Sequence, residues 1–271
     1  SQLHSLEGKS MKKIPVNFVL SIFATFFFML PAAVVLAEGP PPPLAEMWMV
    51  TPKQGQDSEF HKALASHMAY RAEHGDPRAW QAYTPTLGDD LGRVAIRFCC
   101  FNWADLDGYK EWSDSAEKIN AHFEENVAPL AEKWEHYFES LDWGNSHWGD
   151  ATSTYKYFAV TEFNIKPGHG QDFVAARDKM SQIALNQGWA TDNHSWLWAS
   201  TIGGKPQESV IIPHENYASF DRGEEDFSSF LSRNLGSEEA AELMKQFSGA
   251  SWSTDFQIWE HQADLSMSSD D

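Results

Sequence analysis

The chain has 271 residues, of which 42% are hydrophobic and 14% aromatic, so it is long enough to bury a large core. Its formal net charge of −19 repels phosphate backbones, which argues against nucleic acid as a partner. The only two cysteines, Cys99 and Cys100, are adjacent, so the chain is not a disulfide-stapled scaffold. Neighbouring side chains of a strand point to opposite faces, and we predict that these two are small apolar residues that do not bond to each other.

The N-terminal region has the pattern of a secretory signal. Two lysines precede a long apolar run that ends in Val35-Leu36-Ala37, which resembles a small-residue cleavage site. We therefore expect residues 1–37, an upstream extension and signal peptide, to be removed, and the protein to act in the periplasm or outside the cell, free of the membrane. The alternative is an uncleaved anchor, because residues 16–37 are long enough to span a bilayer. A proline-rich linker at 38–46 follows.

The next elements form a first unit, predicted to span residues 47–143. A short apolar strand at 47–51 leads through a glycine turn into a helix at 57–74. Two strands joined by the glycine-rich hairpin at 86–92 follow, then a second helical region after Asn102 and a closing strand at 136–142.

The same order of elements recurs in a second unit, predicted to span residues 157–262 after a linker at 144–156. It has a strand at 157–165, a helix at 171–186, a hairpin at 201–207, a helical region after Asn216 and a strand at 255–261. Residues 263–271 are expected to be a disordered acidic tail.

Matching segments indicate that the chain contains an internal duplication. The segment KQGQDSEF at 53–60 aligns with KPGHGQDF at 166–173, which places Gly55 over Gly168 and Phe60 over Phe173. The order β-α-β-β-α-β is that of a ferredoxin-like unit. One such unit leaves an apolar face of its sheet bare, and that face needs a second layer. We therefore predict an α+β fold in which two tandem ferredoxin-like repeats pack their sheets face to face as an intrachain α/β barrel, with the helices outside.

This pattern resembles the dimeric α/β-barrel superfamily with both halves fused, and within it the antibiotic-biosynthesis monooxygenases. The resemblance rests on the order of elements, the turn IKPGHGQDF at 165–173, and a run in which Trp112 precedes His122 by ten positions. It implies a barrel that binds a small, largely apolar or aromatic molecule, with cofactor-free monooxygenase-like activity as one outcome. Haem-degrading members of the superfamily resemble the chain at Trp112 and His122, which implies haem as the alternative cofactor, with the histidine on iron and the tryptophan on the ring.

The helix at 57–74 carries the candidate site. Phe60 and Leu64 share one stripe of this helix with three basic side chains, His67, Arg71 and His74. We predict that these three line a cleft between helix and sheet and bind an anionic or metal-bearing ligand, with His122 entering from the second helical region. In the alternative, Leu64, Met68 and Ala72 form the core face, and His67 and Arg71 flank it in solvent.

Two further functions remain open at this point. The chain is either a ligand-binding barrel, with or without enzymatic activity, or a structural and interaction module whose interior is fully packed. No HExxH or other zinc-binding spacing occurs, and no catalytic residue or oligomeric state is predicted.

Overall fold

The computed structural model describes residues 41–149, 155–221, 223 and 225–268. The predicted signal peptide at 1–37 lies outside these residues. None of the helices in the described part is both long and apolar enough to cross a membrane.

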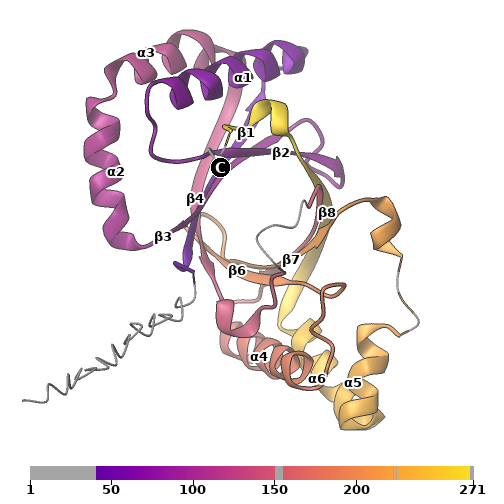
Figure 1. Cartoon of the computed structure of the whole chain (residues 1–271). Coiled ribbons are helices and arrows are strands. Elements are labelled where there is room, and N and C mark those ends of the chain that lie inside the picture. The colour runs from indigo at the N-terminus through magenta and orange to yellow at the C-terminus, as the bar shows by residue number, and fades with distance from the viewer. Residues whose placement is uncertain (1–40, 150–154, 222, 224, 269–271) are drawn as a thin grey trace, which may run out of the picture. The chain divides into compact units, whose positions relative to one another are not determined.

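Eight antiparallel strands form one closed barrel, which confirms the barrel and the mixed α+β class (Figure 1). The first half of the chain contributes four neighbouring strands in the order β4-β1-β3-β2, and the second half contributes β8-β5-β7-β6. The strands are β1 Leu44–Pro52, β2 Gln81–Leu87, β3 Val94–Phe101, β4 Ala131–Leu141, β5 Tyr157–Ile165, β6 Leu197–Ile202, β7 Gln207–His214 and β8 Ser251–His261.

The two four-stranded sheets are joined at both edges, so their inner faces lie opposite each other across the barrel. Strand β2 pairs with β8, where Tyr83 lies opposite His261, and strand β4 pairs with β6, where Glu139 lies opposite Thr201. Edge strands have unpaired N–H and C=O groups, and this closure satisfies them. The space between the sheets therefore becomes the inside of a barrel.

In the part of the chain that the structure describes, six α-helices lie outside the barrel in two groups on opposite sides of it (Figure 1). Each expected second helical region is a pair of helices, broken at Ala116 in the first half and at Gly236, with φ +86°, in the second. The first group is α1 Asp57–Glu73, α2 Trp103–Ser115 and α3 Glu117–Asn126, and the second is α4 Gly170–Asn186, α5 Phe227–Leu235 and α6 Ser237–Gly249.

Each half-sheet packs its outer face on its own helices, which gives two separate apolar cores. Phe60 of α1 and Phe173 of α4, aligned in the sequence, are both 0% exposed, one in each core. Leu64 joins the first, and Met180 and Trp198 join the second. The expectation of an apolar interior shared between the sheets holds only in part: Met49 and Ala95 of the first half pack with Trp259 of the second inside the barrel, and another part of the inner wall is polar.

Two boundaries differ from the expected ones. Strand β1 begins at Leu44, inside the predicted linker, because residues 44–46 already pair with β3 and β4. Part of the predicted tail is ordered: Leu265 and Met267 are buried in the first core, and the amide of Met267 donates to the carbonyl of Trp80 at 2.8 Å.

The prediction for the cysteines is also wrong, because Cys99 and Cys100 form a disulfide. The peptide bond between the two residues is cis. They pack against Ala45 and Leu197 on the inner side of the barrel.

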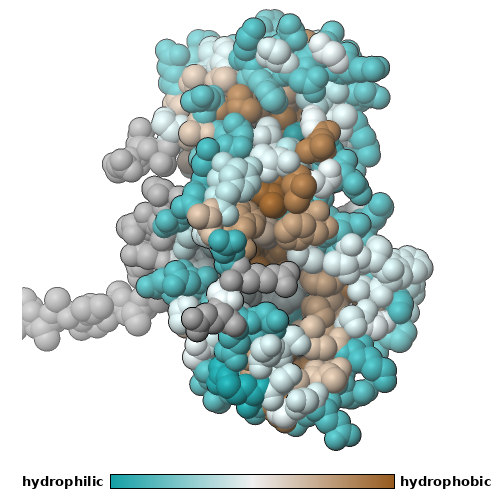
Figure 2. Space-filling model, turned by 90° about the vertical axis from the view of Figure 1, so that its right-hand side faces the viewer, coloured by the Kyte–Doolittle hydropathy of each residue, from teal (hydrophilic) through white to brown (hydrophobic). Residues whose placement is uncertain are grey.

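The helices leave part of the outer barrel surface uncovered. Leu87 of β2 and Phe256 of β8 are each 50% exposed, and Ile212 of β7 is exposed as well. Figure 2 shows hydrophobic residues gathered across one face between two more hydrophilic regions.

Candidate functional site

The barrel encloses a cavity of about 1030 Å³, to which all eight strands contribute. Successive side chains of a strand alternate between its two faces, so every second residue points inward. A cavity of this size is large enough for a small organic molecule. The interpretation of a fully packed interior does not fit it.

One part of the wall is apolar and aromatic. Met49, Ala95 and Trp259 are buried there, and Met47, Tyr83 and Phe158 pack against them. The rings of Tyr83 and Phe158 meet edge to face, with centroids 5.4 Å apart. This part is suited to the apolar body of a ligand.

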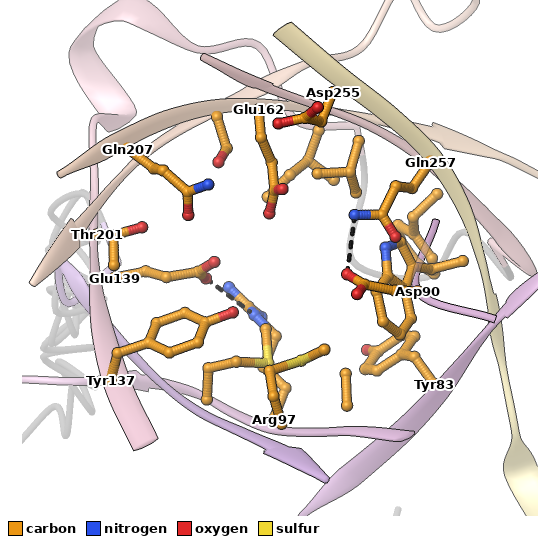
Figure 3. Close-up of a pocket in the computed structure, with 18 of the residues that line it drawn as sticks. Tyr83, Asp90, Arg97, Tyr137, Glu139, Glu162, Thr201, Gln207, Asp255 and Gln257 are labelled. Atoms are coloured by element: carbon orange, nitrogen blue, oxygen red, sulfur yellow. Dashed lines mark hydrogen bonds and ion pairs between the residues drawn. The ribbon is translucent and has the colours of Figure 1, made fainter. Parts of the chain in front are cut away.

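The other part of the wall carries charged side chains (Figure 3), and most of these charges form ion pairs. Arg93 pairs with Asp90, with Nη1 3.0 Å from Oδ1, and with Glu135. The Nε of Arg97 lies 3.3 Å from Oε2 of Glu139. Among the described residues, the Nη2 of Arg97 is buried without a hydrogen-bond partner, so it is available to a ligand oxygen.

Glu162 of β5 is the wall residue with the most altered acidity. Burial is the main cause that raises its pKa from 4.5 to about 7; the nearby carboxylates of Asp90, Asp255 and Glu139 contribute to this shift, and Arg93 opposes it. In the described part of the chain this carboxyl makes no hydrogen bond or ion pair. It points into the cavity (Figure 3) and exists in both protonation states at neutral pH, as a general acid or base must.

Two tyrosines complete the polar wall. Burial is the main cause that raises the pKa of Tyr83 and of Tyr137, and the carboxylate of Glu139 adds to both effects. Both phenols therefore keep their protons at neutral pH and offer O–H donors to the cavity.

Comparison with solved structures identifies the fold. A candidate monooxygenase from Lactobacillus acidophilus NCFM is 12% identical, with a TM-score of 0.51 over 84% of this chain and 96% of that one. A candidate monooxygenase from Fusobacterium nucleatum is 8% identical, with a TM-score of 0.51 over 82% and 94%. The chain adopts the dimeric α/β-barrel fold. No protein-family model matches its sequence, and no curated protein does either.

The α/β barrel places three of the five predicted site residues together, but in the helical layer. The Nδ1 of His67 lies 3.1 Å from the Nδ1 of His122, and its Nε2 lies 3.4 Å from Nη1 of Arg71. Arg71 also pairs with Asp76 at 2.6 Å. His67 is 2% exposed, so the alternative that leaves it in solvent is wrong. Burial, Arg71 and His122 lower the pKa of His67 to about 3.

The other two predicted residues lie at the edge of this cluster. His74 is exposed, and its ring stacks on Tyr70 at 3.8 Å. Trp112 stacks on Tyr109 at 5.2 Å, and the hydroxyl of Tyr109 accepts a hydrogen bond from Nη2 of Arg71 at 2.9 Å. None of the five predicted residues lines the barrel cavity, which lies on the other face of the sheet. Ligand binding by the cluster stays a prediction.

The residues that line the cavity were not singled out from the sequence. Glu162, Glu139 and Gln257 are polar residues inside predicted strands, and two of them alternate with buried apolar neighbours, Glu162 with Phe163 and Gln257 with Ile258. That alternation was the available signal. It was missed because the inward face was expected to be apolar.

The histidines of the described residues bear on the haem alternative. His122 packs between His67 and Tyr70, with ring centroids 5.3 Å and 4.3 Å apart. Of the described residues that line the cavity, His136 is the one histidine, and its Nε2 bonds to Glu46 at 2.9 Å while its ring stacks on Trp48. These histidines do not fit a haem ligand in the cavity. The described residues also contain no group of three or more His, Cys, Asp or Glu side chains suited to a metal ion.

Proposed function

We propose that the barrel binds a small, largely apolar or aromatic molecule in its cavity and that Glu162 exchanges a proton with it. The observation that carries the proposal is a cavity of about 1030 Å³ with a carboxyl group of pKa about 7 on its wall. A group that titrates near the working pH combines the right protonation state with enough basicity to accept a proton.

Each part of the wall has a role in this proposal. The apolar part around Met49 and Trp259 holds the body of the molecule. The unpartnered Nη2 of Arg97 donates to a ligand oxygen and stabilises negative charge that develops there. Removal of a proton from an activated C–H or O–H group leaves an electron-rich anion that dioxygen can oxidise. The reaction class we propose is therefore cofactor-free and monooxygenase-like, which the shared fold with candidate monooxygenases supports.

Binding is tested with a neutral fluorescent probe, N-phenyl-1-naphthylamine. Val160 lines the cavity and Thr161, its neighbour on β5, does not. We expect Val160→Trp to reduce probe binding about tenfold and Thr161→Trp to leave it unchanged, because only the first fills the cavity. Equal effects of the two variants would contradict binding inside the barrel.

Proton transfer is tested with Glu162→Gln on a panel of phenols under air, followed by oxygen uptake. This variant keeps the shape of the side chain and loses the basic oxygen. We expect substrate binding to persist and turnover to fall about 100-fold or more. Turnover that survives in the variant excludes Glu162 as the base.

We also propose that the two halves are tandem ferredoxin-like repeats and that the protein acts outside the cytoplasm. The identical strand order of the halves supports the first proposal. The signal-like segment at 1–37 supports the second, and mass spectrometry of the secreted protein tests it, since cleavage predicts a new terminus at Glu38.

A further inference from the structure

We propose that the cavity binds its ligand through a primary ammonium group, held between the carboxylates of Glu162 and Asp255. This inference rests on the proposed function, because it specifies the charge of the molecule that the same cavity takes.

The two carboxylates lie side by side. Glu162 of β5 and Asp255 of β8 are direct partners in the register of these antiparallel strands, and both line the cavity. Figure 3 shows both side chains at the same part of the wall. Like charges directly opposite each other destabilise a sheet, so this pair gains from a positive charge between its members.

The cationic side chains of the wall do not supply that charge. Arg93 pairs with Asp90 and Glu135, and Arg97 pairs with Glu139. Lys205 lies exposed on the hairpin between β6 and β7 and forms no ion pair with a described residue.

The pair itself has few partners within the described residues. The carboxyl of Glu162 has no hydrogen bond there, and that of Asp255 accepts one, from Nδ2 of Asn164 at 2.8 Å. The wall therefore presents two carboxyl groups that form no ion pair with any described cation, and Arg93, whose charge acts on Glu162, is itself paired with Asp90 and Glu135.

Gln257 gives an independent indication of a ligand that donates hydrogen bonds. It is 5% exposed and lines the cavity on β8, two residues from Asp255. Its Nε2 donates to Oδ2 of Asp90 at 3.1 Å, and since a carboxylate accepts, this bond fixes the orientation of the amide. Its Oε1 is then left buried with no donor from the residues that the structure describes. Such an acceptor is costly to leave unpaired, and a ligand N–H would satisfy it.

An ammonium group matches these acceptors best. It has three N–H donors and a full positive charge, and its hydrogen bonds to carboxylates are stronger than neutral ones. The described residues hold no cluster suited to a metal ion, and an anionic ligand would meet the excess of carboxylates. The apolar wall around Met49 and Trp259 lies in the same cavity and is suited to the rest of such a molecule.

The test compares three probes that share one aromatic body: naphthalen-2-ylmethylammonium, naphthalen-2-ylmethanol and 2-naphthoate. Calorimetric titration of the barrel protein measures each affinity. We expect the ammonium to bind at least about tenfold more tightly than the alcohol, and the carboxylate to bind most weakly. If the alcohol or the carboxylate binds as well as the ammonium, this inference is overturned while the proposed function stands. If none of the three binds, the proposed function fails with it.

Variants locate the preference within the cavity. We expect Asp255→Asn and Glu162→Gln each to lower the affinity for the ammonium about tenfold and to change that for the alcohol less than about threefold. Glu124→Gln removes an exposed carboxylate on α3 and is expected to leave all affinities unchanged. An ammonium preference that persists in both cavity variants overturns the inference.

Discussion

Replacing Glu162 with Gln is expected to stabilise the protein at neutral and alkaline pH. The folded chain holds the pKa of this carboxyl at about 7, against an ordinary value of 4.5. Between pH 4.5 and about pH 7 the folded state therefore binds more protons than the unfolded state, and the free energy of unfolding falls as the pH rises through this range. Above pH 7 the carboxylate costs about 3 kcal/mol relative to a neutral group. Glutamine has nearly the same shape and no charge, so it removes this cost.

The assay is urea unfolding of both proteins from pH 4 to pH 8. We expect the two to differ little near pH 4, and Glu162→Gln to be more stable by about 2–3 kcal/mol at pH 8. Glu124→Gln, which removes an exposed charge, is the control for the general effect of net charge. Parallel pH profiles for the parent and Glu162→Gln would refute the reasoning, because they would mean that the carboxyl ionises equally well in both states.

Three further predictions concern the helical layers. The fold lowers the pKa of His67 from 6.5 to about 3, so the stability that its neutral form contributes is full above pH 6.5 and declines as pH falls. Acidification from pH 7 to pH 5 should therefore lower the free energy of unfolding, measured in urea, by about 2 kcal/mol through this residue. The variant His67→Asn should not show this loss. Arg177 is 4% exposed and pairs with three carboxylates, so Arg177→Met should lower the free energy of unfolding by about 3–5 kcal/mol. Lys179 forms an exposed ion pair with Glu239, and Lys179→Met should change the free energy of unfolding by less than about 1 kcal/mol. Phe173→Ala should cost about 3–5 kcal/mol in the same assay because it opens a void in a buried core, and a loss below 1 kcal/mol would contradict that packing.

Local patterns in the sequence were sufficient for the order of elements and for parts of the two cores. The strand predicted at 157–165 is β5, and the helix predicted at 171–186 is α4 to within one residue. The alignment of Phe60 with Phe173 correctly predicted a buried position in each half. These features depend on periodicity and on glycine turns, which are properties of neighbouring residues.

The candidate site was less predictable. The stripe on the first helix did place His67 against a core, as its spacing with Phe60 and Leu64 indicated. The same spacing does not say whether a cavity lies beyond that stripe. The cavity lies on the other face of the sheet, and its wall combines residues such as Glu162 and Arg97 from opposite halves of the chain.

The sequence by itself determined which segments become strands and helices and which helix faces are buried, because each depends on local spacing of apolar residues. Only the tertiary structure decided that the sheets close edge to edge through β2–β8 and β4–β6. That closure turns the inner sheet faces toward an enclosed space and the outer ones toward the helices. Alternation along a strand distinguishes its two faces but does not say which of them faces inward, and so the carboxylates of the cavity became recognisable only once the barrel was closed.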